Sequence, residues 1–180
     1  MKKTLTTILF CFSISFLFSQ NINLDWYVGT WKYENSAYGE ELIIKLKKSQ
    51  WEIPSSFGGG TEDCLVGVYS YKKNNLLLVD NLEKINEQQN YLYPIQLLSS
   101  VTNPTGKFSL SIIDFTILNG KGDYKLIYGT GSILEMNTIS PKTIKWNLVI
   151  DEQEYFYYDQ IDRFPKGTNL PKNIILSKIE

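Results

Sequence analysis

Hydrophobic and polar residues alternate along much of the chain, in short runs separated by turn residues. In residues 41–53, Leu42, Ile44 and Leu46 alternate with charged residues except at Ile43, which is the period-two pattern of a half-buried strand. The same alternation is clearest in residues 143–151. Both segments are therefore predicted to be strands with one buried face.

Further strands are predicted from short runs of β-branched, aromatic and aliphatic residues. They cover residues 25–34, 64–71, 75–81, 106–118, 123–129, 132–137, 154–159 and 173–178. The polar sequence KKNN after residue 71 indicates a hairpin. Only residues 80–90 have a helix-forming composition, and they lack a wide apolar stripe. About nine to eleven antiparallel strands predict an all-β barrel or sandwich, and closure into a barrel removes exposed edges.

Two of these strands share a glycine. Residues 28–33 and 66–71 both read Val-Gly-x-aromatic-x-Tyr. Glycine inside a strand indicates a bend, a bulge or a close backbone approach, so both strands suit a sheet that coils.

Residues 1–20 have the layout of a cleaved secretory signal. Lys2 and Lys3 precede an apolar run that is too short to span a bilayer, and small or polar residues follow it. Cleavage near Ser19 or Gln20 leaves a single domain, residues 21–180, of about 160 residues, which is long enough for a hydrophobic core. We therefore expect a periplasmic or extracellular protein.

The chain contains two cysteines, and one of them lies in the predicted signal. Lipid attachment at Cys11 is disfavoured because Phe10 is bulky where a small residue normally stands. Removal of the signal leaves Cys64 unpaired, so no internal disulfide is expected. Cys64 could act as a nucleophile only beside a base, and the chain has no histidine. We predict that Cys64 is a buried apolar residue.

Charge and ligand types exclude several function classes. The chain has 18 basic and 19 acidic residues with no block of like charge, which argues against nucleic acid and anionic membranes. Without histidine, zinc lacks its usual ligands, and residues 119–123 (NGKGD) lack the bidentate glutamate of a calcium loop. We expect no cofactor, no catalytic residue and no metal site, and a monomer without a transmembrane helix.

Paired acidic residues and a glycine-rich segment are two further candidates for a functional site, and each also has a structural explanation. A hydrolase would need paired carboxylates, and the candidates are Glu40 with Glu41, Glu62 with Asp63, and Asp151, Glu152 and Glu154. All of them fall at predicted turns or strand ends, where solvated acids are common. Residues 54–63 (PSSFGGGTED) have three glycines but no phosphate-loop lysine, so a loop is predicted there, with Phe57 at the mouth of a barrel.

Gly29-Thr30-Trp31, at the head of the first strand, resembles the G-x-W signature of the lipocalins and their calycin relatives. The resemblance implies an up-and-down β-barrel in which Trp31 closes one end and a basic side chain from near the C-terminus lies across its ring. Arg163 is the only arginine and falls in that region, so Gly29, Trp31 and Arg163 are predicted to form a structural clasp. Such a cation-π pair is worth about 0.5 to 2 kcal/mol. The long C-terminal helix of lipocalins has no counterpart here.

A second resemblance covers most of the mature chain. The sequences VGTWKYE, IIKLKK, CLVGVYSYKKNN and LPKNIILSK together resemble an uncharacterised family of small secreted proteins of Gram-negative bacteria, a domain of unknown function. This resemblance implies an exported β-rich domain and supplies no activity.

The aromatic content leads to the functional hypotheses. The chain has 4 Trp and 12 Tyr, which suit either a cavity for a small hydrophobic or amphipathic ligand or plain core packing. The first hypothesis is an exported barrel that binds such a ligand. The alternative is a ligand-free envelope or extracellular module that recognises a protein or glycan surface. An exposed apolar patch would favour the module, and an aromatic cavity would favour ligand binding.

Overall fold

The computed structural model describes residues 24–52, 55–86, 93–98, 107–127, 133–136, 142–150 and 164–180. Several predictions lie outside these ranges: the signal at residues 1–20 with Cys11, the candidate acids at 151, 152 and 154, the strand at 154–159, and Arg163. In the described ranges the regular elements are strands and 3-10 helices, and no helix could cross a bilayer.

Within the described residues ten strands form one antiparallel sheet. They are β1 (Gly29–Asn35), β2 (Glu40–Glu52), β3 (Thr61–Lys73), β4 (Leu76–Asp80), β5 (Ile95–Leu98), β6 (Lys107–Leu118), β7 (Tyr124–Ile127), β8 (Ile133–Met136), β9 (Thr143–Asn147) and β10 (Asn173–Lys178). The 3-10 helices are η2 (Leu24–Trp26), η3 (Ser36–Tyr38), η4 (Ser55–Phe57) and η5 (Leu82–Asn86). The all-β, antiparallel prediction is confirmed, and β5 is a strand that the prediction missed.

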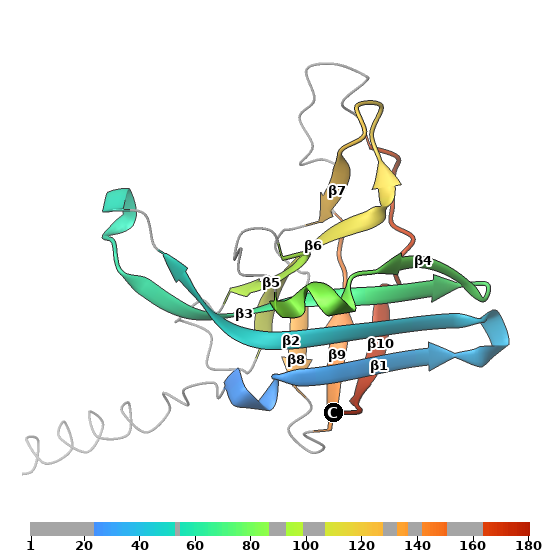
Figure 1. Cartoon of the computed structure of the whole chain (residues 1–180), viewed down its shortest axis with the longest axis horizontal. Helices are drawn as coiled ribbons and strands as arrows, with labels where there is room; N and C mark the ends of the chain where they lie inside the picture. The colour runs from blue at the N-terminus through green and yellow to red at the C-terminus, as the bar shows by residue number, and fades with distance from the viewer. Residues whose placement is uncertain are drawn as a thin grey trace, which may run out of the picture.

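The sheet is strongly curled and barrel-like. Its strand order is β2-β1-β10-β9-β8-β6-β5-β3-β4, and β3 also pairs with β2, so the pairings lead round the sheet and return to their start. Strands β1, β2 and β3 run across β8, β9 and β10, which lie behind them in Figure 1. The first and last strands therefore meet, through the pairing of β1 with β10.

The concave side of the sheet holds the main core. The period-two prediction for β2 is confirmed, because Leu42, Ile44 and Leu46 are all buried there. In β9 the buried residues are Ile144 and Trp146, again on one face. Burial of such side chains, at about 1.5 to 3 kcal/mol each, holds the domain together where no disulfide does.

Strand β3 is buried on both faces from Cys64 to Tyr71. Leu65 and Tyr69 point into the main core, whereas Cys64, Val66 and Val68 form a second apolar cluster on the opposite face. Residues of η5 and Tyr93 cover this second cluster. Two-sided burial explains why the sequence of this strand shows no polar alternation.

The two shared glycines are sites of close approach. A Cβ on Gly67 would lie 2.6 Å from both Leu46 Cδ2 and Lys45 O, on the neighbouring strand. A Cβ on Gly29, whose φ is +130°, would collide with the carbonyl oxygen of Glu180. Each glycine lets another segment pack directly against the strand backbone, as the sequence predicted.

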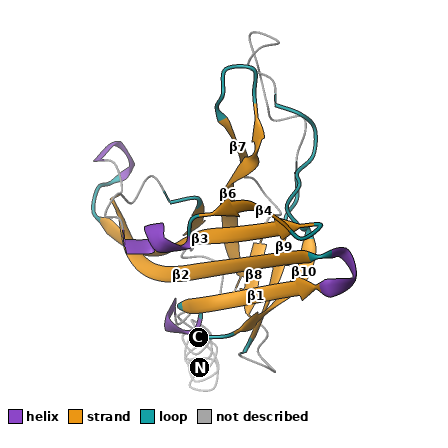
Figure 2. Cartoon of the chain, turned by 45° about the vertical axis from the view of Figure 1, so that its right-hand side comes forward, coloured by secondary structure: helices purple, strands orange, loops and turns teal. Residues whose placement is uncertain are grey.

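The β6–β7 hairpin projects from the curled sheet, and residues 164–172 run beside it toward β10 (Figure 2). At Ile95, the first residue of β5, β3 and β6 diverge. Beyond it β3 pairs with β4, and β6 pairs along its other edge with β7. Beyond this point the buried polar groups Tyr69, Asp114 and Lys125 link β3, β6 and β7 to each other and to residues 164–172.

Candidate functional site

The large aromatic side chains of the interior have protein partners for their polar atoms. Trp31 Nε1 donates a hydrogen bond to Tyr27 O at 2.8 Å, and Trp146 Nε1 donates to Pro171 O at 2.9 Å. Trp31, Trp146 and Tyr27 are all fully buried. These rings are therefore fixed components of the core.

A cation does lie over the Trp31 ring, and it comes from the last strand. Lys178 Nζ is 5.2 Å from the ring centroid, and Lys178 is the β10 residue paired with Trp31. Gly29 supports the same contact, because its missing Cβ leaves room for Lys178 Cε and the backbone of Glu180. Arg163 is outside the described residues, so its predicted place over Trp31 stays a prediction.

Just beyond Ile95, the first residue of β5, Tyr69 provides β6 with the hydrogen bonds that a neighbouring strand would otherwise make. Its hydroxyl donates to Ile113 O at 2.9 Å and accepts a hydrogen bond from Phe115 N at 3.0 Å, so it satisfies two backbone groups of β6. Burial raises the pKa of Tyr69, and the nearby Asp114 carboxylate raises it further. The Phe115 ring stacks on Tyr69 with centroids 6.0 Å apart, and Tyr124 meets Phe115 edge-on.

A buried polar cluster links β6 to residues 164–172. Asp114 is 0% exposed, and its carboxylate accepts hydrogen bonds from the Thr116 backbone and hydroxyl and from the Thr168 hydroxyl. Lys125, paired with Asp114 across β6 and β7, is 1% exposed and donates to Pro165 O and Gly167 O. The hydrogen bonds offset much of the desolvation penalty of these groups and fix the segment in place.

Tyr71 ties the same segment to the first hairpin. Its hydroxyl lies within donating distance of Glu40 Oε1 (2.7 Å) and Asn169 O (2.6 Å). Burial raises the pKa of Tyr71, and the hydrogen bond to Glu40 adds to this effect. Glu40, one of the candidate hydrolase carboxylates, thus accepts a hydrogen bond that holds β2 against β3.

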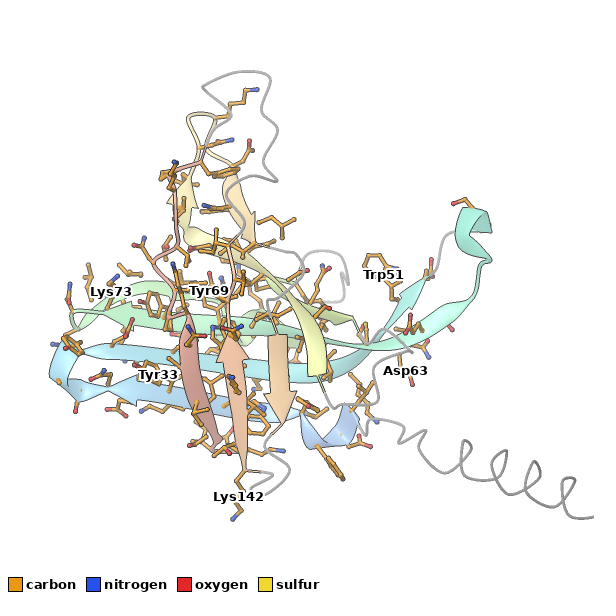
Figure 3. The ribbon with its side chains drawn as sticks, turned by 180° about the vertical axis from the view of Figure 1, so that it is seen from behind. Tyr33, Trp51, Asp63, Tyr69, Lys73 and Lys142 are labelled. Carbon is orange, nitrogen blue, oxygen red and sulfur yellow. The ribbon has the colours of Figure 1, made fainter. Side chains whose placement is uncertain are left out.

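The other candidate carboxylates have separate settings. Glu41 bridges Lys32 and Lys72 at 2.8 Å each, and these hydrogen bonds lower its pKa. Glu62 and Asp63 lie near the start of β3, paired with Trp51 and Gln50 of β2, on the part of these strands that Figure 3 shows extending away from the body. Residues 151, 152 and 154 are outside the described ranges.

Cys64 lies in the second apolar cluster. Burial raises the pKa of its thiol, and the neighbouring Asp63 and Glu62 raise it further. A reactive cysteine needs a lowered pKa, so this environment favours the predicted packing role.

Residues 119–123 form the turn of the β6–β7 hairpin. Asn119 Oδ1 accepts hydrogen bonds from the backbone of Lys121 and Asp123, and these bonds close the turn. Within the described ranges no group of three metal-ligating side chains is close enough to hold a metal. In the other predicted loop, Gly58, Gly59 and Gly60 all have positive φ.

The unusual surface feature is on β4. Leu76, Leu77 and Leu78 are 64%, 50% and 39% exposed, although they are consecutive and apolar. The hairpin that carries them turns at Asn74 and Asn75, both with positive φ, as a two-residue turn requires. Beyond the turn Lys72 pairs with Leu77 and Tyr71 with Val79, so Leu78 is an extra, bulged residue. We call Leu76, Leu77 and Leu78 the β4 leucines.

The β4 leucines were missed as a candidate site because an apolar run predicts burial. The sequence did hold a signal: three successive apolar residues cannot all lie on one face of a half-buried strand. A second set of three exposed apolar residues, Leu118, Tyr124 and Leu126, lies on the β6–β7 hairpin, but its members are not consecutive.

Sequence comparison places the chain in a family. The model of a family of unknown function (DUF6705) matches residues 1–179. The chain belongs to this family. No curated protein matches it, and no solved structure matches it.

Membership in DUF6705 agrees with the resemblance to a domain of unknown function and assigns no chemistry. For this DUF6705 chain the functional argument therefore depends on its own contacts. The described interior is rich in satisfied aromatic groups, and the edge strand β4 presents apolar side chains to solvent.

Proposed function

We propose that this domain is an interaction module that docks a protein surface through the β4 leucines. The observation that carries the proposal is the exposure of three consecutive leucines on a strand that pairs, within the described residues, only with β3. Exposed apolar edge strands are aggregation hazards, which proteins normally avoid with charges, proline or a cover. An exposed apolar patch at such an edge marks an interaction site.

The size of the apolar surface is sufficient for recognition. Full burial of one leucine contributes about 1.5 to 3 kcal/mol, so covering three that are roughly half exposed contributes on the order of 2 to 4 kcal/mol. Backbone hydrogen bonds from an added strand would increase this value. Aliphatic side chains also favour a protein partner over a glycan, since sugars stack on aromatic rings.

The contacts of the interior support the module over the small-ligand barrel. A ligand needs polar groups that converge on free space. The hydroxyl groups of Tyr69 and Tyr71 and the indole N–H groups of Trp31 and Trp146 are instead bonded to the protein itself. Native mass spectrometry of protein from its own host separates the two hypotheses: the module predicts the mass of the chain alone, and a bound small molecule would favour the ligand barrel.

We propose in addition that the fold is calycin-like and that the domain is exported. The cyclic strand pairing and the buried Trp31 beneath a basic side chain support the first proposal. The layout of residues 1–20 supports the second. N-terminal sequencing of protein from the periplasmic and culture fractions tests export, with a mature chain expected to begin near residue 20 or 21.

Site-specific photo-crosslinking in the producing cells tests the docking function. A photoreactive residue replaces Leu77 in one variant and Ile175, an exposed apolar residue of β10, in a control. We expect a defined protein adduct from position 77 and none from position 175, with peptide mapping that places the crosslink on one surface of the captured protein. Equal labelling at both positions, or no adduct at position 77, would contradict the proposal.

A further inference from the structure

We infer that residues 164–169 form a detachable strap, which closes over the buried charges of the β6–β7 hairpin and opens without unfolding of the sheet. In the closed form the strap joins this hairpin to β3, because it forms hydrogen bonds with side chains of both. In the open form those side chains are exposed to solvent. The strap is a conformational device built into the fold, and its opening does not depend on docking at β4.

Side chains hold the closed strap against the β6–β7 hairpin. Lys125 Nζ donates to Pro165 O at 2.9 Å and to Gly167 O at 2.8 Å. The Thr168 hydroxyl donates to the carboxylate of Asp114. Each of these hydrogen bonds uses a side-chain atom, whereas a strand of the sheet is held by a backbone ladder. Water replaces such bonds when the strap opens, so the net cost of losing each one is modest.

Asn169 connects the two hairpins that diverge at Ile95. Its carbonyl oxygen lies 2.6 Å from the hydroxyl of Tyr71 on β3, and its Nδ2 donates to Thr116 Oγ1 of β6 at 3.0 Å. Opening of the strap breaks both contacts. The hydroxyl of Tyr69 continues to join β3 to β6, because its hydrogen bonds do not involve the strap. The opening is therefore local.

The strap buries little apolar surface. None of residues 164–169 is buried, and Pro165, Lys166 and Asn169 are exposed. Leu170, which follows the strap directly, is 2% exposed and belongs to the main core. Segments with few buried apolar side chains open at a lower free energy than the core does. Leu170 is therefore the hinge, and it stays in place when the strap lifts.

The open form leaves no buried charge isolated. Asp114 is 0% exposed and Lys125 is 1% exposed in the closed form, so opening returns water to both charged groups. The two residues are paired across β6 and β7, so their side chains project from one face of the hairpin. Opposite charges in this arrangement remain neighbours after the strap leaves. This compensation favours opening at the strap over opening elsewhere in the sheet.

Acylation of lysine side chains in the whole native protein tests the inference. The protein is treated with the N-hydroxysuccinimide ester of acetic acid, and mass spectrometry of peptides follows the rate at each lysine. Lys125 should react about ten to a thousand times more slowly than the exposed Lys84, because it reacts only when the strap is open. The Phe115 amide, bound to Tyr69, should be protected from hydrogen exchange by a factor at least about ten times larger.

Two substitutions loosen the strap at separate contacts. Thr168→Val removes the hydrogen bond that the strap hydroxyl donates to β6, and Asn169→Ala removes the one that the side-chain amide donates. Each should speed the acylation of Lys125 by about tenfold, which is the effect of losing one hydrogen bond of a buried polar group. The control is Lys166→Gln, at an exposed position of the strap, and it should leave the rate at Lys125 unchanged.

Three results would overturn the inference. Equal protection of Lys125 and the Phe115 amide would mean that only global unfolding exposes them. A rate at Lys125 equal to that at Lys84 would mean that the strap is not closed in solution. Unchanged rates in both loosened variants would mean that the strap does not control access to Lys125. Circular dichroism verifies the fold of each variant, and the comparison of Lys125 with the Phe115 amide in the parent protein needs no variant.

Discussion

Strands β3 and β4 are joined by two residues, yet they have opposite environments. The apolar residues of β3 are buried on both faces, and its two tyrosines donate to groups on β6 and in residues 164–172. The β4 leucines face solvent, and the described chain offers β4 no second strand. Hydrophobicity alone does not distinguish the two strands, but their place in the sheet does. The interior maintains the fold, and the edge is available for recognition.

The largest expected effect on stability comes from replacing one side chain with alanine on each of the two strands and comparing the losses. Tyr69→Ala should lower the free energy of unfolding by about 3 to 5 kcal/mol, because it leaves a cavity and two unsatisfied groups on β6. Leu77→Ala should change it by no more than about 0.5 kcal/mol, because this side chain is half exposed. Urea denaturation of both variants measures the difference. Similar losses would mean that β4 is part of the core.

Gly67→Ala should cost about 1 to 3 kcal/mol, since the added Cβ meets Leu46 and the backbone of Lys45. Denaturation of Gly67→Ala in a Leu46→Ala background provides the control. There the glycine substitution should cost less, because the Leu46 contact is gone and only the backbone contact remains. An unchanged cost would show that the fit against Leu46 is looser than the structure shows.

Tyr69→Phe isolates the hydroxyl and should cost about 1 to 3 kcal/mol at neutral pH. The pKa of Tyr69 is raised in the folded state, so the stability it contributes is present below pH 10 and is lost as the pH rises above that value. The variant should therefore show a shallower alkaline loss, by up to about 1.4 kcal/mol per pH unit. Denaturation curves from pH 9 upward measure the slope, and identical slopes would count against ionisation of Tyr69.

The smallest effect concerns the cation over Trp31, which lies in the same cross-strand row as Tyr69 through Ile44. Lys178→Met keeps the aliphatic stem and removes the charge, with an expected loss of about 0.5 to 1 kcal/mol. Arg163→Met provides the comparison in thermal melts. If only the arginine variant loses stability, the predicted Trp31–Arg163 clasp is the better description.

The sequence predicted the strands well where one face is buried. Alternation located β2 and β9, and the KKNN turn located the β3–β4 hairpin. The strand predicted at residues 123–129 is also found, as β7, but the sequence does not show which of its faces is buried: Tyr124 and Leu126 are exposed and Lys125 is buried. The reason is tertiary: the carbonyl groups of Pro165 and Gly167 bind the lysine, and these residues lie about forty positions away. Local pattern carries no information on such a partner.

The candidate site was predictable only in part. Period two shows that Leu76, Leu77 and Leu78 cannot share one buried face, but it does not show that β4 ends the sheet. The position of β4 depends on β5, which is four residues long. Strand β5 pairs with β3 at Leu65–Gly67, so β4 can pair with β3 only farther along, at Ser70–Lys73. The predicted clasp residues Gly29 and Trp31 lie at the junction of β1 and β10, and Lys178 was not anticipated there.

The buried thiol of Cys64 can be used to measure local opening of the domain. It lies beneath η5, and its raised pKa suppresses reaction while the cover is closed. Modification by a thiol reagent then requires η5 to lift from β3, so the labelling rate reports how often this lid opens. Because η5 follows β4 directly along the chain, anything that immobilises the edge strand should slow that chemistry.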